Sequence, residues 1–149
     1  MFGNRVVLGR VLGFEIRADA SWVLLALLVL WSLASGFFPA FYAGLAQRTY
    51  WSLALLGTIG LFASLLFHEL SHAVVARAYG IEVGGITLFL FGGAAEMQTE
   101  PETPASEFLM AVAGPIASLV AAAVFYLLWQ VLAGLDAPAH WAGVPRYLA

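Results

Sequence analysis

The chain has 149 residues, of which 62% are hydrophobic and 10% are charged, and its mean hydropathy is +0.92. Soluble domains carry about a quarter charged residues, so this composition indicates an integral membrane protein. The net charge of −3 without any lysine excludes the basic surface of a nucleic-acid-binding protein, and the lack of cysteine excludes disulfides and thiolate metal ligands.

The N-terminal segment, residues 1–20, is amphipathic, and its stretch Gly13–Arg17 alternates apolar and polar residues as a short strand or an interfacial segment does. A first membrane span is predicted over Trp22–Ala46, with a break near Gly36 and Pro39. A cleaved signal peptide is the alternative, because arginines precede the apolar run. We favour retention, since the segment is long, contains acidic residues and is followed by an apolar run that continues past any cleavage site.

Two further spans are predicted over Tyr50–Ala78 and Phe108–Leu135. Between them, Ile86–Phe91 is rich in β-branched and aromatic residues and is flanked by glycine pairs, which predicts a short β-hairpin, and residues 98–107 form a polar loop. The expected fold class is therefore an all-α integral membrane protein with about three transmembrane helices and a membrane-associated hairpin between the second and third. We expect residues 1–149 to form a single membrane domain.

The arginines predict how the chain is oriented in the membrane. Four of them fall on one side of the predicted spans and two on the other: Arg5, Arg10, Arg17 and Arg77 against Arg48 and Arg146. By the positive-inside rule, the N-terminus of this multi-pass protein of the inner or plasma membrane is cytoplasmic.

The second span contains the pattern His68-Glu69-Leu70-Ser71-His72. Residues four apart lie on one face of a helix, so both imidazoles can bind one ion, while Glu69 projects about 100° further round and can reach a water beside the metal. His68 lies about 13 Å along the helix from Arg77, which places these ionisable groups inside the hydrocarbon or at its edge, where such groups are usually functional. The alternative, a buried polar cluster without a metal, explains the spacing less well.

Small residues lead into this motif and recur on the third span: Gly57, Gly60 and Ser64, then Gly114, Ser118 and Ala122. Such stripes let helices approach closely, so we expect both to face protein and the histidines to point into the helical bundle. Glu96 borders a glycine pair and could line the site, but it is interpreted as a solvated carboxylate at a strand end. His140 is interpreted as a solvated loop residue.

These motifs together resemble the site-2 protease family of intramembrane zinc metalloproteases. The similar runs are His68–Gly80, Thr87–Met97 and Glu107–Ser118, with Gly9–Arg17 before the first span. The pattern is similar to the prokaryotic branch that often carries CBS domains, although none lies within these residues.

The resemblance implies roles for particular residues of the motifs. It implies that His68 and His72 are Zn²⁺ ligands, that Glu69 is the general base, and that the hairpin at Phe91, Gly92 and Gly93 holds an extended substrate by strand addition.

The resemblance also implies a third zinc ligand that this sequence does not match. In the family it is an aspartate in an Asn/Pro-rich Asp-Gly stretch of a later span, and neither Asp19 nor Asp136 has such neighbours. We therefore expect the chain to be the N-terminal portion of a site-2 protease core, or a naturally shortened relative.

The implied function is that of a zinc-dependent intramembrane endopeptidase that cleaves the transmembrane segments of membrane proteins, with the lipid bilayer and those substrates as partners. Two alternatives remain open. A catalytically incomplete relative would bind membrane segments as a scaffold and purify without stoichiometric zinc. A metal transporter would need further ligands along a pathway, and this chain has three histidines and no cysteine.

Overall fold

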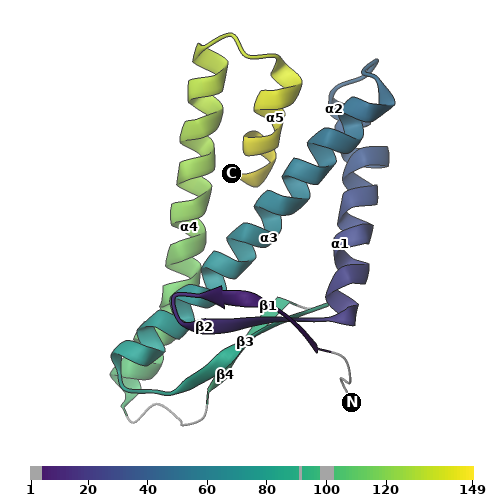
Figure 1. Ribbon diagram of the computed structural model, residues 1–149. Helices are drawn as coiled ribbons and strands as arrows, with labels where there is room; N and C mark the ends of the chain where they lie inside the picture. Colours follow the sequence, from purple (N-terminus) through teal and green to yellow (C-terminus); the bar gives the residue numbers. More distant parts are fainter. Residues whose placement is uncertain (1–4, 91, 98–102) are drawn as a thin grey trace. The chain divides into compact units, whose positions relative to one another are not determined.

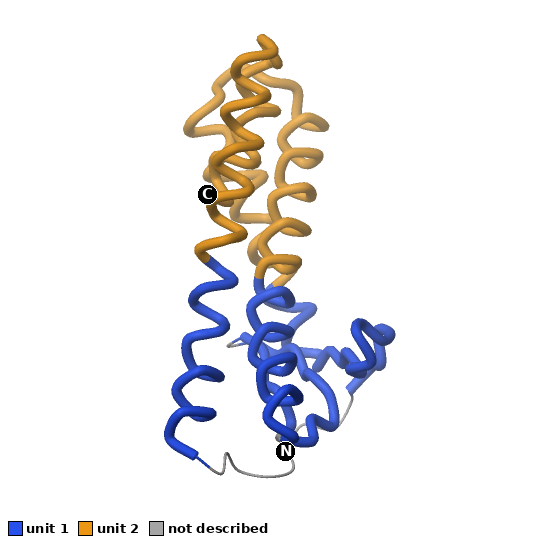
Figure 2. The backbone as a smooth tube through the Cα atoms, turned by 90° about the vertical axis from the view of Figure 1, so that its left-hand side faces the viewer, with its two compact units in different colours: residues 1–25, 65–118 blue, residues 26–64, 119–149 orange. Residues whose placement is uncertain are grey.

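The computed structural model describes residues 5–90, 92–97 and 103–149 (Figure 1). Its elements are, in order, β1 (Arg5–Val11), β2 (Phe14–Asp19), α1 (Ala20–Ser32), the π-helix η1 (Leu33–Phe37), α2 (Phe38–Phe41), α3 (Gln47–Ala78), β3 (Val83–Phe89), β4 (Gly92–Met97), α4 (Pro104–Gly134) and α5 (Ala139–Leu148). They divide into two compact units, Met1–Leu25 with Leu65–Ser118 (unit 1) and Ala26–Ser64 with Leu119–Ala149 (unit 2), drawn in two colours in Figure 2.

Three helical stretches are long and apolar enough to cross a membrane: Ala20–Phe41, Gln47–Ala78 and Pro104–Gly134. They coincide with the three predicted spans to within a few residues. The predicted break in the first span takes the form of η1, because Pro39 in the first turn of α2 cannot donate the backbone hydrogen bond that would continue a regular α-helix.

The strands of unit 1 form one sheet in the order β1-β2-β3-β4. β1 and β2 are antiparallel, joined by a tight turn in which Leu12 and Gly13 both have positive φ, as a type I′ hairpin requires. β2 pairs in parallel with β3, and β3 pairs antiparallel with β4.

The all-α fold class was therefore too narrow, although the hairpin between the second and third spans is present as β3 and β4. The physical reason is that the N-terminal segment, in which apolar and polar residues alternate, forms strands that pair with β3. It does not remain an isolated interfacial segment. Whether the hairpin contacts the membrane stays a prediction.

One face of the sheet packs on α3 because apolar residues alternate along β2 and β3. Phe14 and Ile16 of β2 and Ile86 and Leu88 of β3 are buried together with Leu70 of α3. Leu70 belongs to the turn that carries His68 and His72, so the sheet core holds that turn in place.

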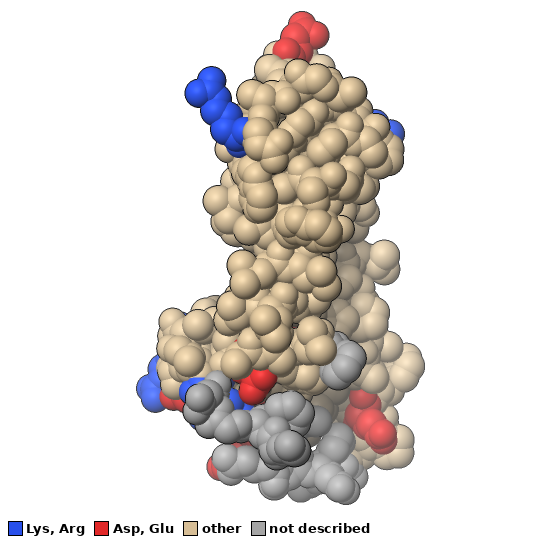
Figure 3. Space-filling model, turned by 90° about the vertical axis from the view of Figure 1, so that its right-hand side faces the viewer, with Lys and Arg blue, Asp and Glu red and all other residues tan. Residues whose placement is uncertain are grey.

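The core of unit 2 is separate and made of aromatic and aliphatic side chains. Phe38 and Leu53 are fully buried there, with Tyr50 and Val144 beside them. Figure 3 shows one face of the molecule, on which most of the described surface is uncharged and charged side chains are few. Such a surface suits contact with lipid.

Candidate metal centre

His68 and His72 lie one turn apart on α3, and their rings meet. The two Nε2 atoms are 3.1 Å apart, and the ring centroids are 4.8 Å apart with an angle of 73° between the ring planes. The four-residue spacing on a regular helix is sufficient to bring the rings to one face. The remaining orientation of each ring comes from α4.

Each ring uses its other nitrogen to contact α4. The Nδ1 of His72 lies 2.6 Å from the backbone oxygen of Met110, and the Nδ1 of His68 lies 2.8 Å from the Oγ of Ser118. A carbonyl oxygen only accepts, so the Nδ1 of His72 donates, and the Nε2 of a neutral ring then carries a lone pair. Second contacts of this kind orient the imidazole ligands of metal sites.

The separation of the two Nε2 atoms fits a shared zinc ion. Zinc–nitrogen bonds of about 2.0–2.1 Å in tetrahedral geometry place two ligand nitrogens about 3.3 Å apart, close to the 3.1 Å between His68 and His72. The two rings are therefore placed so that they could supply two ligands to one ion. Among residues 5–90, 92–97 and 103–149, no group of three histidine, aspartate or glutamate side chains is placed to hold a metal ion.

Two glycines let the backbones of α4 and β4 come close to the side chains of His68, His72 and Glu69. A Cβ on Gly114 of α4 would lie 2.2 Å from the Nε2 of His72 and 2.5 Å from that of His68. A Cβ on Gly93 of β4 would lie 2.4 Å from the Cγ of Glu69. Both distances are shorter than real Cβ atoms show, so a larger residue at either position would displace the histidine rings or the side chain of Glu69.

A cleft of about 420 Å³ opens onto Glu69 and His72. Its other lining residues are mostly small: Ala76, Ala94, Ala95, Glu107, Met110 and Ala111. α3, α4 and β4 supply these walls, so a chain segment that enters the cleft meets the carboxylate of Glu69. Of the three residues expected to hold substrate, Gly92 and Gly93 begin β4, and Phe91 lies outside the described residues.

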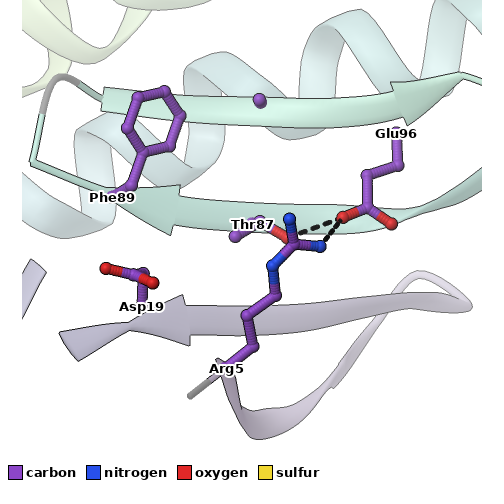
Figure 4. Close-up of a pocket in the computed structure, with 6 residues that line it drawn as sticks. Arg5, Asp19, Thr87, Phe89 and Glu96 are labelled. Carbon is purple, nitrogen blue, oxygen red and sulfur yellow. Dashed lines mark hydrogen bonds and ion pairs between the residues drawn. The ribbon is translucent and has the colours of Figure 1, made fainter. Parts of the chain in front are cut away.

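A second pocket, of about 210 Å³, lies on the opposite face of the sheet from α3 (Figure 4). Glu96 pairs there with Arg5 and, at 2.9 Å, with Arg17, and it accepts a hydrogen bond from Thr87. Asp19, which also lines this pocket, accepts a hydrogen bond from the backbone of Ser21 and so caps α1. Glu96 and Asp19 thus both have hydrogen-bonding partners, Glu96 within the sheet and Asp19 at the start of α1.

Glu96 lies near the end of β4 and is partly exposed, as expected, but it is also held in ion pairs. The side chain neither lines the histidine cleft nor stands alone, because the strand register places it on the face that carries the arginines. In the same network, Arg17 donates a hydrogen bond to Glu15 and thereby lowers the pKa of the Glu15 carboxyl from its ordinary value of 4.5. Ion pairs therefore link β1 and β2 to β4 across this face of the sheet.

Sequence reasoning missed the contribution of α4 to the site. Gly114 and Ser118 were interpreted only as a packing stripe, and the carbonyl of Met110 has no sequence signature. The available signal was the four-residue spacing of Gly114 and Ser118, which matches that of the histidines. The two glycines of the stripe on α3 do face protein, because Gly57 lies against Leu33 and Gly60 lies against Leu148.

Known proteins were compared with this chain in sequence and in structure. Residues 56–145 match Peptidase family M50. The chain is 42% identical over 146 residues to Rip3 of Mycobacterium tuberculosis, which is named as a zinc metalloprotease, covering 98% of this chain and 37% of that protein. It is 44% identical over 117 residues to sll0528 of Synechocystis, also named as a zinc metalloprotease, covering 78% of this chain and 30% of that protein. The chain thus spans about a third of the length of these relatives.

A solved structure has the same fold. The site-2 protease from Methanocaldococcus jannaschii aligns with a TM-score of 0.60 and 23% identity, covering 86% of this chain and 52% of that one. Together with three apolar helices of membrane-spanning length, these matches identify the chain as a multi-pass membrane protein. The chain belongs to Peptidase family M50, the site-2 protease family of membrane metalloproteases.

Proposed function

We propose that this chain forms the metal-binding part of a zinc-dependent intramembrane endopeptidase that cleaves the transmembrane segments of other membrane proteins. The observation that carries the proposal is the convergence of two Nε2 atoms at 3.1 Å on a membrane-spanning helix, with Glu69 in the same turn. Ionisable groups at such a depth are costly and usually functional.

In this proposal His68 and His72 hold the ion through Nε2, and Glu69 carries protons. A zinc ion held there would supply Lewis acidity, which would polarise a peptide carbonyl and lower the pKa of a bound water. Glu69 lines the cleft, so it accepts the proton of the attacking water and then delivers it to the departing amine. The contacts of both Nδ1 atoms with α4 keep the rings aimed while the proton moves.

We also propose that the substrate binds in extended form beside β4. A helix hides its amides in hydrogen bonds, so a transmembrane substrate must unwind locally before cleavage. β4 is the last strand in the sheet order, and its outer edge offers backbone groups to an added strand. Gly93 brings this strand against Glu69, which supports Gly92, Gly93 and the neighbouring Phe91 as the substrate-holding segment.

A scaffold that binds membrane segments without cleaving them is the second candidate. It is favoured by one observation, that the described residues supply two metal ligands and no third. Zinc content separates the two candidates. The endopeptidase proposal predicts about one zinc per chain in the whole protein, and loss of that zinc in His68→Ala and His72→Ala. The matched control is His140→Ala, which should retain the zinc; this histidine lies on α5 and not in a loop as expected.

The orientation of the chain is a further part of the proposal, with the N-terminus and the sheet on the cytoplasmic side. The arginines of β1 and β2 support it by the positive-inside rule. A cysteine introduced at exposed Val6 should react with a membrane-impermeant maleimide only from the cytoplasmic side.

The activity test uses the whole protein that carries this chain, reconstituted in liposomes with a single-span reporter. The reporter carries a tag at each end and a Gly-Pro pair in its membrane helix. Glu69→Gln should abolish cleavage and leave the zinc content unchanged, because Glu69 moves protons and does not bind the ion. The control variant Glu82→Gln carries the same substitution at an exposed position just after α3. It should cleave the reporter at the wild-type rate. Undiminished cleavage by Glu69→Gln would refute the proposed mechanism.

A further inference from the structure

We infer that Ser118 is a positioning residue, which fixes the tautomer of His68 and thereby sets the affinity of the histidine pair for a divalent cation. This inference rests on the proposed metal-binding role of His68 and His72. It extends that role to a residue of α4 that does not touch the ion. The observation that motivates it is the contact of 2.8 Å between the Oγ of Ser118 and the Nδ1 of His68.

The hydroxyl of Ser118 has a different hydrogen-bonding partner from the hydroxyls on α3. Four hydroxyls on α3 donate to the carbonyl four residues earlier in their own helix, at 2.7–3.0 Å: those of Ser52, Thr58, Ser64 and Ser71. Such bonds are the usual way for a helical serine or threonine to satisfy its hydroxyl. Within the described residues, Ser118 makes no such bond, and its hydroxyl instead contacts a ring on a different helix.

The direction of the hydrogen bond between Ser118 and His68 determines which nitrogen of His68 is free. The Nδ1 of His72 donates to a carbonyl, so its Nε2 carries a lone pair that faces the Nε2 of His68. If the Oγ of Ser118 accepts from Nδ1–H, the Nε2 of His68 is also bare, and two lone pairs face each other at 3.1 Å. That arrangement is unfavourable by itself and is relieved by a cation between the nitrogens.

The other tautomer of His68 opposes metal binding. If Ser118 donated to Nδ1, the proton of His68 would sit on Nε2 and form a hydrogen bond to His72. A cation would then have to displace that proton, since an imidazole binds a metal only through an unprotonated nitrogen. Acceptance by Ser118 therefore favours the tautomer that is ready for the ion.

The spacing on α4 matches this role. Met110, Gly114 and Ser118 are four residues apart, so they lie along one face of the helix. This face presents a carbonyl to His72, a bare Cα to both Nε2 atoms, and a hydroxyl to His68. α4 thus supplies an acceptor for each ring, with room for the rings between them.

The test measures cation affinity directly, without catalysis, in the whole protein stripped of metal in detergent. Co²⁺ is titrated and followed by its visible absorption, and zinc is then added in competition. Ser118→Ala should weaken binding of both metals 10- to 100-fold, the range that loss of an orienting partner produces. The side chain is exposed, so its truncation leaves no buried cavity. Ser64→Ala, which loses only a bond within α3, should bind as the wild type does.

A second pair of variants keeps the test decisive if Ser118→Ala does not fold. Ser118→Thr retains the hydroxyl, and Ser118→Val has the same shape without it. The Ser118→Thr variant should bind the cation with an affinity within a few-fold of that of the wild type, while the Ser118→Val variant should not. In ¹⁵N spectra of the metal-free protein, Val should also shift the His68 ring toward the tautomer protonated at Nε2, which a purely structural defect would not do.

The outcomes separate this inference from the proposed function. If the wild-type protein binds neither metal, the metal-binding role itself is wrong. If the wild type binds and the Ala and Val variants bind equally tightly with unchanged spectra, the role of Ser118 is overturned. Loss of affinity in both the Thr and Val variants would also overturn it, because the hydroxyl would then not be the group that matters.

Discussion

Replacing Gly114 with alanine tests the geometry of the metal centre most directly. The added methyl carbon would lie 2.2 Å from the Nε2 of His72 and 2.5 Å from that of His68. Ordinary contact begins near 3.4 Å, so the nearer ring must move by about 1.2 Å. Metal–ligand distances tolerate only about 0.2 Å of error. A displacement several times larger should abolish stoichiometric zinc binding, and the overpacking should cost roughly 1–3 kcal/mol of stability.

The assay is the zinc content of the purified protein, measured together with its thermal unfolding. Gly134→Ala is the matched control, because this glycine ends the same helix and has nothing within 4 Å of a new Cβ. The control should keep its zinc and be unchanged or slightly more stable, as alanine favours the helix. If Gly114→Ala bound zinc as tightly as the control, the rings would not meet against α4 as described, and the reasoning for the whole centre would fail.

Two further predictions concern the sheet. Gly93→Ala places a methyl 2.4 Å from the Cγ of Glu69, so cleavage of the reporter should fall sharply while zinc content stays normal; full activity would contradict this proximity. Arg17 lowers the pKa of Glu15, so this carboxylate stabilises the fold at pH values above 4.5 and loses its effect as the pH falls through its folded-state pKa. Glu15→Gln should therefore flatten the decline of the unfolding temperature below about pH 4.5; equal declines would count against the ion pair.

The sequence was a good guide to the helical part of the fold, because length and apolarity alone define a membrane span. It was a poorer guide to the sheet. The alternation in Gly13–Arg17 predicts a strand, but nothing local indicates that this strand pairs in parallel with β3, some 70 residues later. Val6, Val7 and Leu8 of β1 also lack a clear alternation and are exposed, so the pairing of β1 came only from the structure.

The site divides in the same way between local and long-range information. His68, Glu69 and His72 share one helix turn, so their spacing predicts that they meet, and the structure brings the two rings to 3.1 Å. The contributions of Gly114 and Ser118 depend on how α4 packs on α3, which spacing within either helix does not fix. The ion pairs of Glu96 likewise depend on strand order and could not be predicted from its neighbours in sequence.

The contacts with α4 also bear on why a motif of two histidines and a glutamate is not by itself a metal site. An imidazole ligand carries one proton, and on a lone helix either nitrogen can hold it. Here a carbonyl occupies the Nδ1 side of one ring, a hydroxyl occupies that of the other, and a glycine leaves room for both Nε2 atoms. α3 therefore carries the two proposed ligands, and the contacts from α4 orient both rings, so the candidate metal centre depends on the pair of helices and not on the motif alone.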